Sequence, residues 1–228
     1  MLRYTYLLID LFTVLPPFLL SFDSKVRFYT QWKYYLPGLC FTAVFFLVWD
    51  YFKTRYGVWS FNDRYVIGIW LFGMPIEEYL FFFAVPYACT FIYVAIGSYT
   101  KYRVFPDSAR YVVWAASAVM FVSSFFLVHR AYTFSVLFLL GLVFPLSTYV
   151  LSREKLDRFL QMYLISLVPM SIVNGLLTAL PVVMYDNTQN LGVRIGTIPV
   201  EDFLYSAILL LMNVAIYEWN KRRHIVTV

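Results

Sequence analysis

Seven long apolar runs constrain this chain more than any other feature of its sequence. They cover residues 4–20, 34–49, 75–97, 111–128, 132–151, 159–183 and 199–219. Each approaches or exceeds the roughly 17 to 25 residues that a helix needs to cross a bilayer. Because unpaired backbone groups are costly in hydrocarbon, segments of this kind form helices. With only 14% of its 228 residues charged, the chain is predicted to be an all-α membrane protein with seven transmembrane helices.

The charges give a predicted orientation in the membrane. No small-residue cleavage site follows the first apolar run, so we expect a first span there and not a signal peptide. Once seven spans are drawn, twelve of the 18 basic residues fall on one side. The positive-inside rule then predicts an integral protein of the inner or plasma membrane, with its N-terminus outside and its C-terminus in the cytoplasm. This asymmetry explains the net charge of +5, so we predict no nucleic-acid partner.

The chain also matches itself, without gaps, at an offset of 124 residues. Six aligned pairs are identical: Gly68 and Gly192, Pro75 and Pro199, Glu77 and Glu201, Leu80 and Leu204, Ile92 and Ile216, and Tyr93 and Tyr217. Acids and amides coincide as well: Glu78 with Asp202, Asn62 with Asp186, Asp63 with Asn187, and Asp50 with Asn174. Shared polar positions of this kind indicate a duplication.

The duplication predicts how the chain is divided. We expect a first repeat at 1–98, a connector helix at 99–130 and a second repeat at 131–228. Three spans plus one connector return the chain to its starting side, so the two three-helix repeats should run parallel. Equivalent helices can then face each other across one shared cavity.

Each half carries a Pro-x-Glu-acid motif where an apolar run begins. Proline suits the first helical position, which would make Glu77 and Glu201 the third residues of their helices. Acids in a first turn can simply favour the helix dipole. An ionisable group inside a membrane span is nevertheless a functional hypothesis. We expect the identical pair to face the shared cavity, where one carboxyl can hold a proton and the other can accept one.

Several other chemistries have no support in the sequence. The nine glycines contain no Gly-x-Gly, which argues against a dinucleotide or phosphate loop. There is no Cys or His cluster for a transition metal, and the last span has no lysine for a retinal Schiff base. We therefore predict no metal and no cofactor, although the sequence leaves the need for a hard cation or a flavin open.

Aromatic residues are abundant, with 23 Phe, 20 Tyr and 6 Trp. Many of them suit lipid-facing positions and interface belts. Others adjoin the acids, and aromatic rings stabilise a cation through their negative faces. We predict that a substrate pocket is lined by Tyr79, Phe81, Phe82, Phe203 and Tyr205.

The two motif segments, from Gly73 to Phe82 and from Leu191 to Phe203, resemble the paired signatures of the small membrane-integral lycopene cyclases. Members of that family occur as half-size subunits, as tandem fusions, and joined to a phytoene synthase in fungi. The resemblance covers essentially the whole chain, and we expect the stand-alone tandem form without the synthase portion. It implies lycopene as the substrate and γ-carotene, then β-carotene, as products of an intramolecular lyase or isomerase.

The residues fit the chemistry that this resemblance implies. Lycopene is a hydrocarbon, so an enzyme can act on it by protonating an alkene. We expect Glu77 or Glu201 to protonate C2 of the ψ end group, and a carboxylate to remove the C6 proton. The predicted catalytic residues are Glu77, Glu201, Glu78 and Asp202, and the predicted supporting network is Asp50, Asn62, Asp186 and Asn174. Expected partners are lipophilic carotenoids, the lipid bilayer and other carotenoid-biosynthesis enzymes.

Other functions stay open at this point. A carotenoid hydratase would use the same acid step but admit water, and a cyclase could act on another carotenoid. Duplicated halves with intramembrane acids also suit a proton-coupled transporter. A non-catalytic assembly subunit is a further alternative. The sequence leaves open the number of rings formed, the half that supplies the acid and the oligomeric state.

Overall fold

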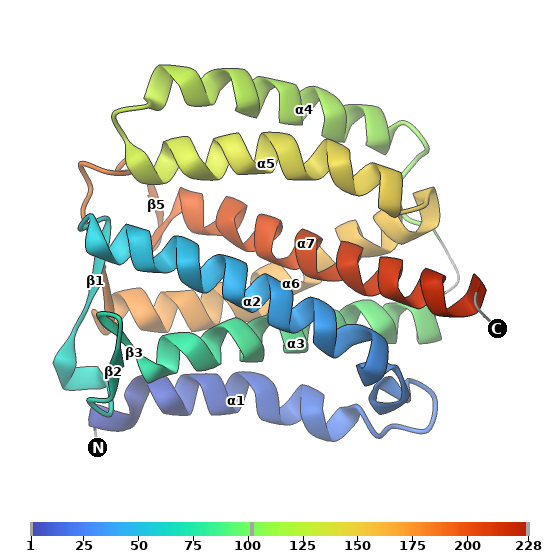
Figure 1. The fold of residues 1–228 in the computed structure, drawn as a ribbon, viewed down its shortest axis with the longest axis horizontal. Helices are drawn as coiled ribbons and strands as arrows, with labels where there is room; N and C mark the ends of the chain where they lie inside the picture. Colours follow the sequence, from blue (N-terminus) through green and yellow to red (C-terminus); the bar gives the residue numbers. More distant parts are fainter. Residues whose placement is uncertain (1, 101–102, 227–228) are drawn as a thin grey trace.

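The computed structural model describes residues 2–100 and 103–226, with side chains to residue 223. Seven long helices run side by side along one direction (Figure 1). They are α1 (Thr5–Leu20), α2 (Trp32–Arg55), α3 (Ile76–Tyr99), α4 (Ala109–Ser124), α5 (Ala131–Val150), α6 (Arg153–Ala179) and α7 (Val200–Val226). Short 3-10 turns occur at Leu2–Tyr4, Phe28–Gln31, Asp63–Tyr65 and Phe125–Leu127. The seven helices are long and apolar enough to cross a bilayer, which confirms the predicted spans.

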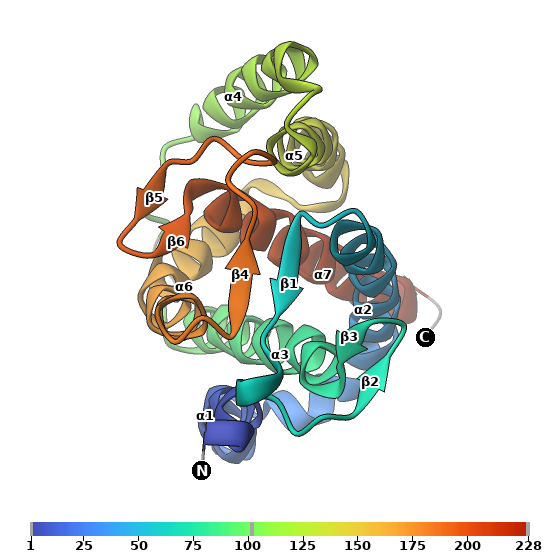
Figure 2. The same cartoon turned by 90° about the vertical axis from the view of Figure 1, so that its left-hand side faces the viewer.

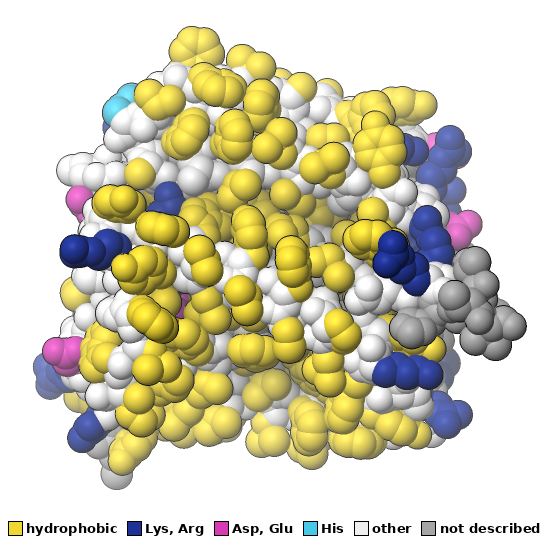
Figure 3. Space-filling view, viewed as in Figure 1, with side chains coloured by type: hydrophobic (Ala, Val, Ile, Leu, Met, Phe, Trp, Pro, Cys, Tyr) yellow, Lys and Arg dark blue, Asp and Glu magenta, His cyan; other side chains and the backbone are white. Residues whose placement is uncertain are grey.

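The outer surface has the character of a membrane protein. Figure 3 shows apolar side chains covering the middle of the molecule, with Lys and Arg side chains gathered toward its two ends. Large apolar side chains face outward along the helices, as Phe12 at 72% exposure and Val168 at 67% illustrate. In water such a surface would be unfavourable, whereas in lipid it is the expected one. The helices and this apolar belt fit an integral membrane protein.

Two similar three-helix units make up the bundle. α1 to α3 form one unit and α5 to α7 the other, and α1 and α5 begin at the same end (Figure 1). Within the units α1 packs on α3 and α5 packs on α7, while across them α2 packs on α7 and α6 packs on α3. The α2–α7 and α6–α3 contacts are equivalent when the two units are interchanged, as a twofold axis parallel to the helices requires. α4 packs against α5 on the outside of the bundle (Figure 2), so the predicted pair of parallel repeats with a connector helix is confirmed.

Six short strands, which the sequence did not predict, are present in the described residues. They gather at one end of the bundle (Figure 2). β1 (Trp59–Phe61) from the first half pairs antiparallel with β4 (Val183–Tyr185) from the second. Two hairpins, β2–β3 (Trp70–Leu71 with Met74–Pro75) and β5–β6 (Arg194–Ile195 with Ile198–Pro199), lead directly into α3 and α7. The motif prolines therefore end a strand. Helix α3 begins one residue after Pro75, which makes Glu77 its second residue and not its third.

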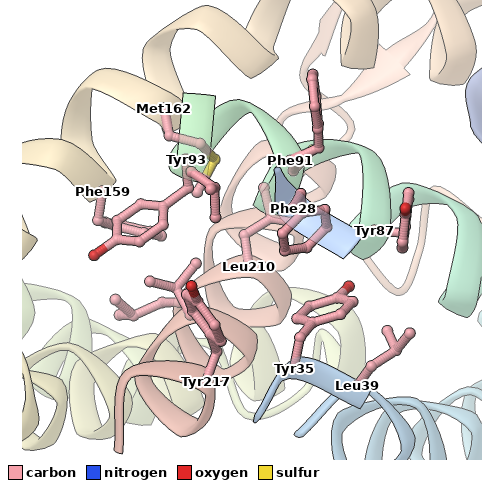
Figure 4. Packing of buried hydrophobic residues seen from close by; sticks show 14 of the residues in the cluster. Phe28, Tyr35, Leu39, Tyr87, Phe91, Tyr93, Phe159, Met162, Leu210 and Tyr217 are labelled. Atoms are coloured by element: carbon pink, nitrogen blue, oxygen red, sulfur yellow. The ribbon is translucent and has the colours of Figure 1, made fainter. Parts of the chain in front are cut away.

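A dense aromatic core packs toward the opposite end of the bundle, around the start of α2 and the ends of α3 and α7, and Figure 4 shows its side chains. Phe28, Tyr35, Tyr93 and Tyr217 are each at most 1% exposed. Tyr93 and Tyr217 occupy equivalent positions in the two halves, and their rings meet edge to face with centroids 6.4 Å apart. The tightly packed end therefore lies away from the strands and from both acidic motifs.

Candidate active site

A cavity of about 550 Å³ lies inside the bundle at its strand end. Its walls come from α1, α3, α6 and the first turns of α7, and residues of β1 and β4 line it at the end of the bundle. Along α3 it extends from Glu78 to Ile92, which corresponds to roughly 20 Å at the rise of an α-helix. The cavity is thus a long apolar slot with acidic residues toward one end.

Glu78 and Asp202, which are equivalent residues of the two motifs, both line this cavity. Their side chains are 7% and 3% exposed. The Tyr6 hydroxyl donates to Glu78 Oε2 at 2.6 Å. Asp202 accepts three hydrogen bonds, from Tyr132 Oη at 2.6 Å, Tyr185 Oη at 2.9 Å and Asn174 Nδ2 at 3.4 Å. The two acids therefore share a cavity but differ in how many donors surround them.

Tyr185 belongs to β4, outside the membrane-spanning helices. Its phenol is buried, and burial raises its pKa well above the ordinary value, with the charge of Asp202 acting in the same direction. The phenol consequently stays protonated at neutral pH and remains a hydrogen-bond donor. The strand that joins the two halves thus supplies a hydrogen-bond donor to the Asp202 carboxyl group.

Asp50 adds a third carboxyl to the cavity. It lies on α2, is 2% exposed, and has no hydrogen-bond partner for Oδ2 among the described residues. Its equivalent in the second half, Asn174, also lines the cavity and donates to Asp202. Both members of this predicted pair of supporting residues are therefore found beside the acids.

Glu77 and Glu201 are buried but face away from the cavity. Ile67 N donates to Glu77 Oε1 and Leu191 N donates to Glu201 Oε1, both at 2.7 Å, and the Thr133 hydroxyl also donates to Glu201. The described residues around the cavity include neither glutamate. We expected this identical pair to face the cavity. Neighbouring helical residues point about 100° apart. Because Glu77 and Glu201 point toward the preceding loops, the residues that follow them, Glu78 and Asp202, point into the cavity.

Asn62 and Asp186 lie outside the cavity, in the loops at the strand end. Asn62 accepts a hydrogen bond from Arg64 N at 3.1 Å and caps a 3-10 turn. Asp186 accepts from the backbone N–H and the hydroxyl of Thr188, both at 2.8 Å, and these bonds hold its pKa below the ordinary value. Both side chains shape loops and do not reach the described walls of the cavity.

The predicted aromatic lining is found in part. Phe81, Phe82 and Tyr205 line the cavity, whereas Tyr79 and Phe203 are absent from its described walls. The Tyr79 hydroxyl instead donates to the Leu71 carbonyl at 3.0 Å.

The rings around Asp202 were not predicted. Tyr132 stacks on Tyr185 with centroids 6.0 Å apart, and Trp59 meets Tyr132 edge to face at 5.1 Å. All three line the cavity.

A sequence signal for Tyr132 exists at a different offset. Tyr6 and Tyr132 play equivalent parts toward Glu78 and Asp202, yet they are 126 residues apart. A gapless match at 124 places Tyr6 opposite Arg130 and Tyr132 opposite Leu8. Allowing a two-residue gap after the first helix of each half would have revealed this pair. The strands keep the offset of 124, because Asn62 N donates to the Val182 carbonyl and Asp186 N donates to the Val58 carbonyl.

A further buried acid in the same three-helix unit as Glu78 was missed. Asp10 lies on α1, is 3% exposed, and has no hydrogen-bond partner for either carboxyl oxygen among the described residues. It follows Tyr6 by one helical turn. Within the part of the chain that the structure describes, no group of three or more His, Cys, Asp or Glu residues is placed to hold a metal ion.

Buried acids facing an apolar cavity within a helical bundle form a candidate acid–base site. Comparison with known families agrees with this description. A family model described as lycopene cyclase matches residues 3–96 and 129–220, which is more than half of the chain. The matched segments cover α1 to α3 and α5 to α7, except for the ends of α3 and α7, and leave out α4. The chain therefore belongs to the lycopene cyclase family.

Two fungal proteins, each named bifunctional lycopene cyclase/phytoene synthase, are similar to parts of this chain. The one from Pyrenophora tritici-repentis is 27% identical over 109 residues, which is 47% of this chain and 19% of the relative. The one from Phaeosphaeria nodorum is 38% identical over 52 residues, or 23% of this chain and 9% of the relative. The matches thus span less than a fifth of either relative. No solved structure matches this chain.

Proposed function

We propose that this protein is a lycopene β-cyclase, which converts the ψ end groups of lycopene into β-ionone rings and yields γ-carotene and then β-carotene. The observation that supports this most strongly is the pair Glu78 and Asp202 facing one apolar cavity. A hydrocarbon substrate offers nothing to hydrogen-bond, so it suits apolar walls. The carboxyl groups at one end are placed to act on its terminal double bond.

The different surroundings of the two acids suggest different roles. Glu78 accepts one hydrogen bond, whereas Asp202 accepts three. Hydrogen bonds to a carboxylate favour its ionised form, and two charged carboxylates sharing a desolvated site repel each other. We therefore assign Glu78 as the proton donor and Asp202 as the base.

The proposed reaction balances without any oxidant or reductant. Glu78 gives its proton to C2 of the ψ end, which leaves a cation at C1. The C5–C6 double bond attacks C1, the C1–C6 bond forms, and the cation moves to C5. Asp202 removes the C6 proton and the C5–C6 double bond returns. Proton transfer from Asp202 to Glu78 restores the starting state, so the product is an isomer of the substrate.

The aromatic residues around Asp202 suit the cationic intermediate. The faces of Trp59, Tyr132 and Tyr185 attract a positive charge without forming a bond to it. Trp59 and Tyr132 are buried and Tyr185 is half-buried, and together these rings keep water from the site. This matters because water would capture the cation as an alcohol. The strand pair β1–β4 contributes two of these rings and covers the acids at the end of the bundle.

Glu77 and Glu201 serve as positioning residues in this proposal. Each holds the backbone of the loop that precedes its hairpin, through the bonds from Ile67 N and Leu191 N. These bonds fix the first turn of α3 and of α7. The next residue in each helix is thereby directed into the cavity.

We also propose that the N-terminus lies outside the cytoplasm and the C-terminus inside it, which places the acids toward the outer side of the bilayer. The two ends of the described chain lie at opposite ends of the bundle (Figure 1). Twelve of the 18 basic residues belong to the side of the C-terminus and six to the side of the N-terminus, and the side richer in basic residues faces the cytoplasm. Reporter fusions at each terminus test this orientation. A cytoplasmic N-terminus would contradict it.

Expression in a lycopene-accumulating bacterium tests the proposed function. We expect lycopene to be replaced by pigments of the same mass whose spectra and retention match γ-carotene and β-carotene. Products heavier by one water would instead identify a hydratase. Unchanged lycopene, with the protein well inserted in the membrane, would contradict the proposal.

A further inference from the structure

The two halves of the protein enclose very different amounts of space. Among the described residues, α1 contributes six residues to the cavity wall and α6 contributes eight. Their counterparts in the other half, α5 and α2, contribute one described residue each, Tyr132 and Asp50. The cavity is thus confined to one side of the pseudo-twofold axis, although both acids reach it.

Side-chain volume explains this asymmetry. At the offset of 124 residues, Met170 and Val173 of α6 correspond to Phe46 and Trp49 of α2. Phe46 is fully buried, its ring centroid lies 5.1 Å from that of Tyr205, and Trp49 approaches the same ring at 4.8 Å. Large rings therefore fill the region that would mirror the cavity. The smaller residues of α6 leave their side hollow.

A buried lysine also ties the filled side together. Lys53 of α2 is 7% exposed and donates to the Ala131 carbonyl and the Ser135 hydroxyl at the start of α5, both at 2.6 Å. The equivalent residue of α6 is Leu177, whose side chain has no donor to offer α1. Two hydrogen bonds from Lys53 thus link α2 to α5, and Leu177 cannot form their equivalents between α6 and α1.

The hollow side reaches the lipid-facing surface between α1 and α6, which are neighbours on one side of the bundle (Figure 2). Several residues of the cavity wall are also exposed on the outside of the molecule, namely Phe12 at 72%, Ile172 at 59% and Leu176 at 43%. Pro16 of α1 and Pro169 of α6 stand in the same wall and are exposed too. A side chain that lines both the cavity and the outer surface marks a mouth. This mouth faces the bilayer.

We infer that the protein has a single end-group chamber, entered from the bilayer between α1 and α6. The two ends of a linear carotenoid are then cyclised in two separate bindings, and the monocyclic carotenoid leaves the chamber between them. This inference rests on the proposed function and adds the mode of substrate binding. One end group lies against Glu78 and Asp202, the polyene follows the slot beside α3, and the remainder of the molecule extends into lipid.

Filling the chamber with the side chains of the other half tests this inference. Val173→Trp, alone or with Met170→Phe, places in α6 the rings that α2 carries. The matched control is Val168→Trp on the same helix, at a position that is 67% exposed and outside the described cavity wall. Comparable yield and a monodisperse elution profile establish that the variants fold.

One chamber predicts that Val173→Trp suppresses both rings together. The rate of lycopene consumption should then fall at least about tenfold, without accumulation of the monocyclic product. Val168→Trp should behave as wild type. A separate site in each half predicts a different result, because the untouched site would continue to consume lycopene and the monocyclic product would accumulate. That result, or full activity of the folded Val173→Trp variant, would overturn the inference.

A time course and a binding measurement complete the test. With lycopene in excess over wild-type protein in liposomes, we expect the monocyclic product first and the dicyclic product after a lag. A constant ratio of the two from the first turnovers would contradict separate bindings. The carotenoid retained by purified protein, whether lycopene or its cyclised products, should reach one molecule per chain in wild type and Val168→Trp, and fall sharply in Val173→Trp. Retention in this pattern without ring formation would uphold the chamber while contradicting the proposed cyclase.

Discussion

The two halves of this protein share their helices, hairpins and motifs, but they differ around the acids and in the space beside them. Asp202 is surrounded by three donors and Glu78 by one. The α1–α6 side is hollow, whereas Phe46 and Trp49 fill the α2–α5 side. Duplication brought two equivalent carboxyls to one axis. In the proposed reaction, divergence in a few side chains allows these two carboxyl groups to serve as acid and base.

Removing the base should have the largest effect. Asp202→Asn keeps the size of the side chain but cannot accept the C6 proton, so we expect ring formation to fall by about 10² to 10⁴-fold. The rate of ring formation in membranes, normalised to inserted protein, measures this. Asp202→Glu restores a carboxylate and should recover part of the activity. Equal activity of Asp202→Asn and wild type would contradict the assigned role.

The comparison of filled and hollow sides predicts unequal effects on stability. Phe46→Ala removes a fully buried ring and should lower the free energy of unfolding by about 3 to 5 kcal/mol. Met170→Ala enlarges a cavity that already exists and should cost less than about 2 kcal/mol. Reversible unfolding in mixed micelles compares the two variants. Similar losses for both would indicate that the two sides are packed alike.

The unequal donors around the acids give a smaller expected effect. Hydrogen bonds to a charged group contribute about 1.5 to 3 kcal/mol, so Tyr132→Phe should slow ring formation by roughly tenfold or more. Tyr6→Phe should have a weaker effect, because a neutral carboxylic acid depends less on a donor. Initial rates of the two variants provide the measurement. A greater loss in Tyr6→Phe would reverse the assignment of acid and base.

The smallest effects are expected in the loops, where Asn62 and Asp186 match by sequence but their side chains do not reach the described cavity wall. Asn62→Ala and Asp186→Ala remove a cap and a loop contact. We expect product formation to stay within about twofold of wild type, as for most surface substitutions away from special features. Pigment yield per inserted protein measures this. A large loss of product in either variant would indicate that the residue takes part in the reaction.

The sequence was sufficient for the helices and for the duplication. Lipid requires continuous apolar helices, and the repeated Pro-x-Glu-acid motif marks the same place in each half. Which acid faces inward could not be predicted, because it depends on where the helix begins. Strands β3 and β6, of two residues each, extend through Pro75 and Pro199 and shift that start by one residue.

The donors and the asymmetry of the cavity were also beyond the sequence alone. Tyr6 and Tyr132 are related by an offset of 126 residues, which the stronger match at 124 conceals. The chamber exists because Met170 and Val173 are smaller than Phe46 and Trp49 within a packing arrangement of several helices. Side-chain volume becomes informative only once it is known which helices adjoin.

The most direct test of this account compares two neighbouring residues of α3. Glu78→Gln and Glu77→Gln make the same chemical change one position apart, one facing the cavity and one facing the loop. We predict that the initial rate of lycopene consumption falls by about 10² to 10⁴-fold in Glu78→Gln, while Glu77→Gln, whose amide oxygen still accepts from Ile67 N, retains most of its activity. Near-normal activity in Glu78→Gln, with loss in a folded Glu77→Gln, would contradict it.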